Sequence, residues 1–249
     1  MNGSEAMLLV DNSQMNSDEL EPLLEALFRE HAREASESRL ASLPAITKLA
    51  EINDEDTGMH VERTQIYCRL LAAELRKEEF YSQVISDDYI RDIYHAAALH
   101  DVGKKGIPDH ILLKKGRLDP EEFEVIKQHV EIGKQTLREV RKKCKQNQLI
   151  NLGFALTASH HEKWDGSGYP EGLYGQDIPL SARIMALVDV YDALRSKRPY
   201  KEPLSHVESV HIIKEGGGLH FDPSVVKAFS SIEAQFEEIF DKMKEEGPN

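Results

Sequence analysis

The sequence is short of cysteine, of long apolar runs and of positive charge. Its 249 residues include two cysteines, Cys68 and Cys144, too few for a disulfide framework or a thiolate metal site. We therefore expect a protein of the reducing cytoplasm whose metal ligands, if any, are nitrogen and oxygen. No run approaches the roughly 20 apolar residues of a membrane span, and no secretory signal is recognisable. The net charge of −13 argues against nucleic-acid or anionic-membrane binding.

Clear strand alternation is also lacking, and apolar residues recur instead at helical spacing. We therefore predict an all-α protein. Residues 1–50 are expected to be a partly helical N-terminal extension, either a packing arm or a dimerisation element, and residues 51–249 the main domain. Helix starts are predicted after Asp119, which precedes a proline and two acidic residues, and after Pro179 and Asp222.

The chain does contain polar residues on the inward faces of its predicted helices. The stretch 99–109 reads LHDVGKKGIPD, and the apolar spacing before it places His100 on a buried stripe. Burying the adjacent Asp101 carboxylate costs several kcal/mol unless a cation or a donor compensates it. A helix cap would explain one such pair, and a metal ion is the alternative.

Similar residues recur along the chain. His129 follows an apolar helical position and Asp189 stands among apolar neighbours, so both are expected inside the protein. Each histidine alone is explained by a cap or a satisfied core position, but together they are too polar for a passive core. Imidazole and carboxylate are ligands for Fe, Mn and Zn, and this number suits two ions with Asp101 able to bridge them. The expected ligands are His60, His100, Asp101, His129, His160, His161 and Asp189.

These motifs together resemble the HD-GYP domain, a subgroup of the HD-superfamily phosphohydrolases that degrade cyclic di-GMP. The resemblance covers about residues 50–240 and implies an HD-superfamily helical bundle. The motifs that carry it are HDVGK at 100–104, GIPD at 106–109, His129, HHE at 160–162, DGSGYP at 165–170, Arg183-Ile184, Asp189 and RPYK at 198–201.

The resemblance implies a centre of two or three iron or manganese ions. One metal would be held by His60, His100, Asp101 and Asp189. The next would be held by His129, His160 and His161, with Asp101 as the bridge. In some members a glutamate at the position of Asp56 holds a third metal, and the shorter aspartate here leaves two and three ions open.

The resemblance also implies how substrate is held. Lys104 suits a phosphate oxygen in the transition state, and Arg198 and Lys201 resemble the family's phosphate-binding pair. A solvated basic turn is the alternative for that pair. The loop Gly168-Tyr169-Pro170 is expected to form the rim of the site, with Tyr169 facing substrate, and to contact diguanylate cyclases; an ordinary turn is its alternative.

Two residues depart from the family pattern. Lys105 stands where an apolar residue is usual, and Arg195 where threonine is usual. Either is expected to attract phosphate or to crowd the pocket.

The function expected is metal-dependent hydrolysis of cyclic di-GMP to linear pGpG, and a second cut would give GMP. One alternative is a weakly active or inactive module that binds cyclic di-GMP and relays it through residues 1–50. Another is a phosphodiesterase for a different cyclic dinucleotide, such as cyclic GMP-AMP. The complete ligand set argues against a degenerate module, and the choice between the two substrates is left open by the motifs.

Overall fold

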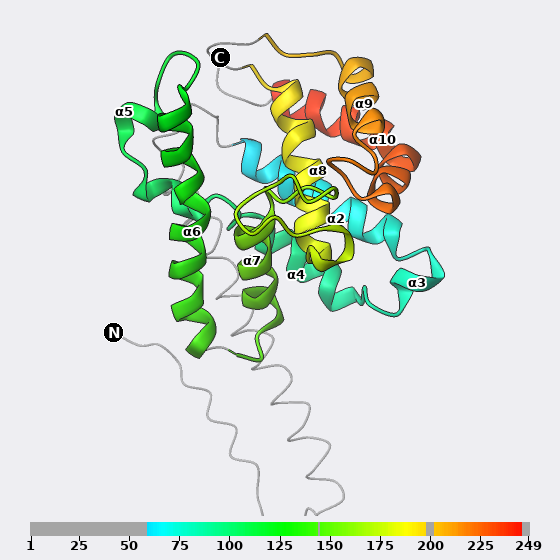
Figure 1. The fold of residues 1–249 in the computed structure, drawn as a ribbon. Helices are drawn as coiled ribbons and strands as arrows, with labels where there is room; N and C mark the ends of the chain where they lie inside the picture. Colours follow the sequence, from blue (N-terminus) through cyan, green and yellow to red (C-terminus); the bar gives the residue numbers. More distant parts are fainter. Residues whose placement is uncertain (1–58, 144, 198–201, 246–249) are drawn as a thin grey trace, which may run out of the picture. The chain divides into compact units, whose positions relative to one another are not determined.

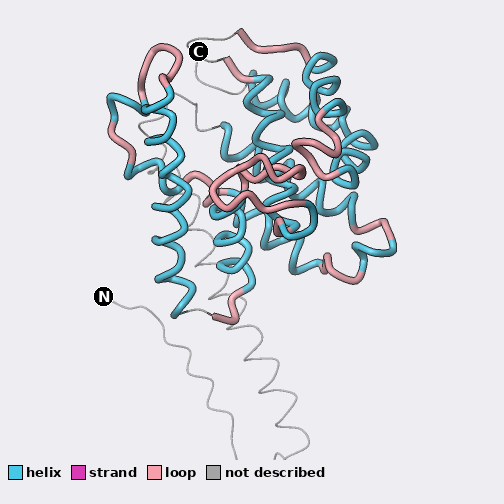
Figure 2. The backbone as a smooth tube through the Cα atoms, in the orientation of Figure 1, coloured by secondary structure: helices cyan, strands magenta, loops and turns pink. Residues whose placement is uncertain are grey.

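The computed structural model describes residues 59–143, 145–197 and 202–245. This part of the chain is built from helices, with two isolated β-bridges and no strand (Figures 1 and 2). The elements are α2 (Met59–Leu75), α3 (Glu79–Ser82), α4 (Asp87–Ala97), η1 (Val102–Gly106), α5 (Asp109–Leu112), α6 (Pro120–Lys143), α7 (Gln148–Ser159), η2 (Gly175–Asp177), α8 (Leu180–Arg195), α9 (His206–Glu215) and α10 (Pro223–Glu245). The prediction of an all-α fold is confirmed.

Two predictions about the whole chain are not tested by these helices. The extension 1–50 and the domain boundary beside it lie outside the described residues. None of the described helices is both long and apolar enough to cross a membrane.

The helix starts follow from capping. Asp119 accepts a hydrogen bond from the Glu122 amide at 2.9 Å, and the Glu122 carboxylate accepts from the Asp119 amide at 2.8 Å. This reciprocal arrangement satisfies two amides that a helix start leaves without partners. α10 begins directly after Asp222, whose carboxylate accepts from the Ser224 amide at 2.8 Å, whereas α8 begins directly after Pro179 without a side-chain cap. All three predicted helix starts are therefore confirmed.

An aromatic core joins three helices that are distant in sequence. The ring of Tyr67 in α2 stacks on Phe236 in α10 with centroids 4.1 Å apart, and its hydroxyl donates to the Phe236 carbonyl at 3.1 Å. Tyr191 of α8 meets both rings edge-to-face. Buried aromatic pairs of this geometry add to the stabilisation that their buried area provides. This core fixes α2 and α8 against each other, and each carries part of the site described below.

A second contact brings η1 against α6. Gly103 lies so close to α6 that a Cβ there would overlap the carbonyl oxygen of His129 and stand 2.6 Å from the Gly133 amide nitrogen. Only glycine permits this approach. It places the His100–Asp101 stretch next to His129, while α7 packs against both α4 and α6.

We predict that Gly103→Ala lowers the free energy of unfolding by about 1–3 kcal/mol, because the added methyl must push η1 away from α6. Gly116→Ala is the matched control, since a Cβ at that position meets nothing within 4 Å. Urea unfolding of both variants checks this. Equal midpoints for the two would mean that the close approach is not required.

Candidate metal centre

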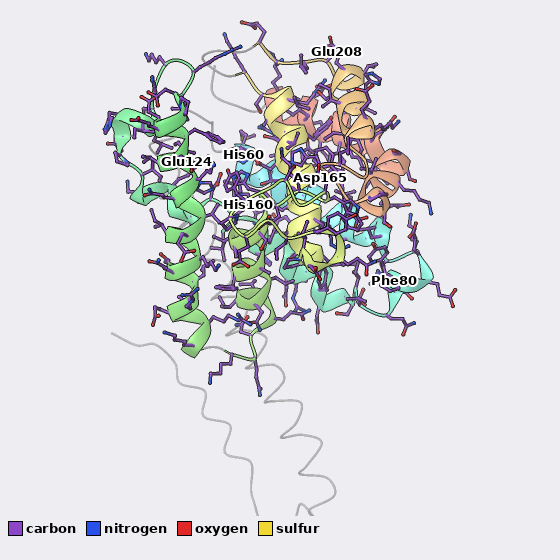
Figure 3. All side chains as sticks on the ribbon, in the orientation of Figure 1. His60, Phe80, Glu124, His160, Asp165 and Glu208 are labelled. Carbon is purple, nitrogen blue, oxygen red and sulfur yellow. The ribbon has the colours of Figure 1, made fainter. Side chains whose placement is uncertain are left out.

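Five segments of the chain bring histidine and aspartate side chains to one region. In Figure 3, the labelled His60 and His160 lie between the ribbons of α6 and α8. The side chains come from the first turn of α2 (His60), the link between α4 and η1 (His100, Asp101), the middle of α6 (His129), the end of α7 (His160, His161) and α8 (Asp189). All are buried except His161 and Asp189, which are partly exposed.

The ligand atoms of these residues form two groups. Within each group the atoms lie within 4.8 Å of one another, a spacing that one metal ion can span. The first group is His60, His100 and Asp189. The second is Asp101, His129, His160 and His161. The structure therefore brings together all seven residues that the sequence singled out as ligands.

Asp101 belongs to the second group, and its carboxylate also faces the first. Its Oδ2 is 3.1 Å from Nε2 of His100, and its Oδ1 is 3.3 Å from Nε2 of His129 and 3.7 Å from Nε2 of His160. One carboxylate oxygen thus faces each group. This is the placement that a carboxylate needs in order to bridge two ions.

The imidazole rings are oriented by hydrogen bonds on their outer nitrogens. The Nδ1 atoms of His100, His129 and His160 donate to backbone carbonyls at 2.8, 2.7 and 3.1 Å, and Nδ1 of His60 donates to the Asp192 carboxylate at 2.8 Å. Because these oxygens only accept, the proton of each neutral ring stays on Nδ1. Nε2 then presents its lone pair to the centre, as metal-ligating histidines do.

The inner nitrogens fit a cation. Nε2 of His129 and of His160 are buried and find no hydrogen-bond partner among the described residues. Nε2 of His60 and Nε2 of His100 lie 3.5 Å apart, so two lone pairs face each other in the neutral rings. Unpaired buried acceptors such as Nε2 of His129 and Nε2 of His160 are costly, and metal ions would compensate them.

The charges favour the same interpretation. Burial lowers the pKa of His129 to about 4, although the Asp101 carboxylate opposes this shift. Burial, with His160 and His129 nearby, also holds the pKa of His161 well below its usual range. Burial would raise the pKa of Asp101, but Lys104 and His100 outweigh it and hold that pKa well below its usual range. At neutral pH His129 and His161 are therefore neutral imidazoles near an ionised carboxylate, the forms that bind metal. Burial would lower the pKa of His100, but the Asp101 carboxylate outweighs it and raises that pKa, so a cation that binds at His100 must displace its proton.

Asp192 holds His60 in position by a hydrogen bond. No pattern in the sequence indicated Asp192 as a site residue. Its fully buried carboxylate accepts from His60 Nδ1 at 2.8 Å and from Arg63 at 2.5 and 2.8 Å. Burial would raise the pKa of Asp192, but hydrogen bonds from Arg63 and His60 lower it to about 2. Asp189, expected to be inside, keeps 22% of its side chain exposed. The fully buried position belongs to Asp192, which lies one helical turn further along α8.

Lys104 lies at the centre as expected for a phosphate-binding cation. Its Nζ is 2.9 Å from Oδ2 of Asp101, and its side chain is partly exposed. The ammonium is therefore held beside the carboxylate that faces both ligand groups.

The glycine-rich loop covers one side of the centre. The Tyr169 ring stacks on His161 with centroids 4.8 Å apart, and the Tyr169 amide donates to the His161 carbonyl at 3.2 Å. Glu162, the third residue of the HHE motif, is buried, and its carboxylate accepts from the amides of Glu171 and Leu173 at 2.8 and 3.1 Å. Glu162 thus anchors the loop from within, and Tyr169 lies against a candidate ligand.

The remaining predicted site residues divide into two sets. Asp56, Arg198 and Lys201 lie outside the described residues, so their roles stay predictions. Arg195 packs on the Phe240 ring at 4.7 Å and donates to Asp241 at 3.1 Å, both on α10, and Lys105 is exposed. The contacts of Arg195 are with α10, and the expectation that Arg195 or Lys105 attracts phosphate or crowds the pocket stays a prediction.

Comparisons with known proteins identify the family. The HD domain family matches residues 44–225. The chain belongs to the HD domain family, and the resemblance to HD-GYP proteins is confirmed. A Bdellovibrio bacteriovorus structure, "Bd1817, a HDG"Y"P protein", shares the fold with a TM-score of 0.52 at 16% identity, over 80% of this chain and 63% of that chain.

Two relatives from Vibrio cholerae serotype O1 are more similar in sequence. One, named cyclic di-GMP phosphodiesterase, is 46% identical over 203 residues, which is 82% of this chain and 41% of the relative. Another, named 3′3′-cGAMP-specific phosphodiesterase 2, is 40% identical over 183 residues, which is 73% of this chain and 32% of the relative. The chain spans about half the length of the curated relatives it matches first.

We predict that Asp192→Asn destabilises the metal-free protein by about 3–5 kcal/mol, because it removes the buried charge that pairs with Arg63 and accepts from His60. The folded pKa of about 2 lies below the unfolded value, so the carboxylate stabilises the fold above about pH 4. The stabilisation by the ionised carboxylate is lost as pH falls toward 2. The Asp192→Asn protein lacks this stabilisation at every pH. Urea unfolding between pH 7 and pH 3 measures both effects.

Asp241→Asn is the matched control, since this α10 carboxylate is largely exposed and pairs with Arg195 at 3.1 Å. Its cost should stay below about 1 kcal/mol. Asp192→Asn should also weaken metal binding roughly 10- to 100-fold, as loss of a hydrogen bond to a ligand histidine does. Wild-type stability and metal affinity in Asp192→Asn would refute the supporting role.

Proposed function

We propose that this chain is a metal-dependent phosphodiesterase that hydrolyses cyclic di-GMP to linear pGpG, which a second cut would convert to GMP. The observation that carries the proposal is the pair of adjoining histidine and aspartate groups with Asp101 between them. When bound, two metal ions supply Lewis-acid activation of water and neutralise charge on a phosphate. The names of the relatives support this reaction class.

We assign four ligands to each metal ion, and Asp101 is the ligand that both ions share. His60, His100, Asp101 and Asp189 would hold one ion, and His129, His160 and His161, with Asp101, the other. Imidazole and carboxylate ligands suit iron, manganese and zinc, and iron or manganese is proposed because the resemblance to HD-GYP domains implies those metals. Asp56 is proposed as a ligand for a third ion only, so two ions do not depend on it.

The chain's own cations and loop complete the site. The Lys104 ammonium, beside Asp101, is suited to balance charge that develops on a phosphate oxygen. Arg198 and Lys201 are proposed to hold the second phosphate, which would attract an anion to a chain of net charge −13. Tyr169 is proposed to face the substrate from the rim, next to His161.

Two other functions make different predictions. A relative specific for 3′3′-cGAMP makes that dinucleotide the second candidate substrate. A module that only binds cyclic di-GMP would keep the ligand set but release no product. Incubating Mn- or Fe-loaded protein with each dinucleotide and analysing for linear products separates the three functions, and pGpG formed from cyclic di-GMP faster than any product from 3′3′-cGAMP is expected.

The proposals for partners and for cellular location rest on fewer observations. A diguanylate cyclase is proposed to contact the Gly168-Tyr169-Pro170 loop, in which Pro170 is exposed. Dimerisation through residues 1–50 stays a prediction. A cytoplasmic location is supported by the free thiol of the buried Cys68.

We predict that Asp101→Ala abolishes turnover and removes most of the bound metal, because both ligand groups lose the carboxylate between them. Elemental analysis after dialysis and chromatography of pGpG measure the two effects. Asp109→Ala is the control, since it removes an exposed carboxylate at the start of α5. Wild-type metal content or turnover in Asp101→Ala would contradict the proposal.

A further inference from the structure

Beside the metal centre, three side chains form a surface in which Phe123 and Lys127 have no part in the proposed chemistry. We call Phe123 and Lys127 of α6 and Tyr169 of the loop the rim cluster. Nζ of Lys127 lies 5.1 Å from the Phe123 ring centroid and 5.5 Å from that of Tyr169. The two rings are 6.4 Å apart and nearly perpendicular. The cluster therefore holds one cation between two aromatic rings.

The rim cluster adjoins the centre and also reaches solvent. Tyr169 stacks on His161, a candidate ligand, at 4.8 Å. Phe123, at the other end, leaves 45% of its surface exposed. A candidate metal ligand at one end and an exposed aromatic ring at the other is an arrangement suited to a ligand subsite, since large exposed rings are common where binding occurs.

The partner of Lys127 can give way to a ligand. The ammonium pairs with Glu124 at 2.5 Å, but that carboxylate is 68% exposed. Ion pairs this open to water contribute little to stability. A bound molecule with a suitable acceptor can therefore take the ammonium at small cost.

We propose that the rim cluster is a nucleobase subsite that selects guanine. This inference rests on the proposed function, because the subsite would receive the base of a dinucleotide whose phosphate lies at the metals. The Phe123 ring offers a face for stacking, which every base accepts. Lys127 donates to O6 and N7 of guanine, whereas adenine presents an amino donor in place of O6.

Glu124 adds to this selectivity. An ionised carboxylate only accepts hydrogen bonds, and guanine carries an N1–H and a 2-amino group beside O6, both absent from adenine. The neighbouring ammonium and carboxylate thus match the acceptor and donors on one edge of guanine. The rim cluster would explain a preference for cyclic dinucleotides that contain guanine over cyclic di-AMP, which contains none.

The test separates stacking from base selection. We would measure the Kd of GMP and of AMP on the metal-loaded protein, and kcat/KM for cyclic di-GMP and cyclic di-AMP. Lys127→Met should weaken GMP binding roughly ten-fold and AMP binding less than about two-fold. Phe123→Ala should weaken both by a similar factor of about five or more.

Lys142→Met is the matched control. Lys142 lies on the same helix and pairs in the same way, with Glu139 three residues earlier at 2.7 Å, but near the far end of α6. The Lys142→Met protein should bind GMP and AMP as the wild-type protein does. This control removes the general effect of losing one positive charge.

The outcomes also distinguish the subsite from the reaction. If Lys127→Met binds GMP like Lys142→Met, or weakens GMP and AMP equally, the guanine subsite is overturned even when cyclic di-GMP is hydrolysed. If GMP selectivity depends on Lys127 but no cyclic dinucleotide is cut, the subsite stands and the proposed reaction fails. Wild-type protein that binds neither nucleotide overturns the subsite.

Discussion

The arrangement of the rest of the site depends on the buried carboxylate of Asp101, because its charge must be compensated. One of its oxygens faces His100 and the other faces His129 and His160, all buried. A charge in such surroundings is costly unless other charges compensate it. Lys104 supplies one cation, and the inward lone pairs of the histidines add to the need for more positive charge. The centre is therefore electrostatically complete only with metal ions in it.

The fold makes this arrangement by close contacts between segments far apart in sequence. The glycine contact at Gly103 brings η1 against α6 and so brings Asp101 to His129. The Arg63–Asp192 pair orients His60, and the Arg63 guanidinium lies over the Phe240 ring of α10 at 4.9 Å. The last long helix thereby supports a ligand in the first described one.

Much of this could be predicted from the sequence because it depends on local pattern. Helical spacing placed His129 on an inward face, and the Asp119 cap follows from neighbouring residues. The resemblance supplied the division of ligands into two groups. The pairing of Asp192 with His60 spans 132 residues and depends on how α2 and α8 pack, so no local pattern indicated it. The actual partners of Arg195 were missed for the same reason, because Asp241 lies on a helix 46 residues later.

Anomalous scattering from crystals of the protein, measured at the iron, manganese and zinc edges, tests the central claim most directly. It counts the ions and identifies them at once. The account predicts two adjacent ions roughly 3.5–4 Å apart, with Asp101 bound to both. Crystals grown with iron or manganese that show no ion at these residues, or a single ion away from Asp101, would contradict it.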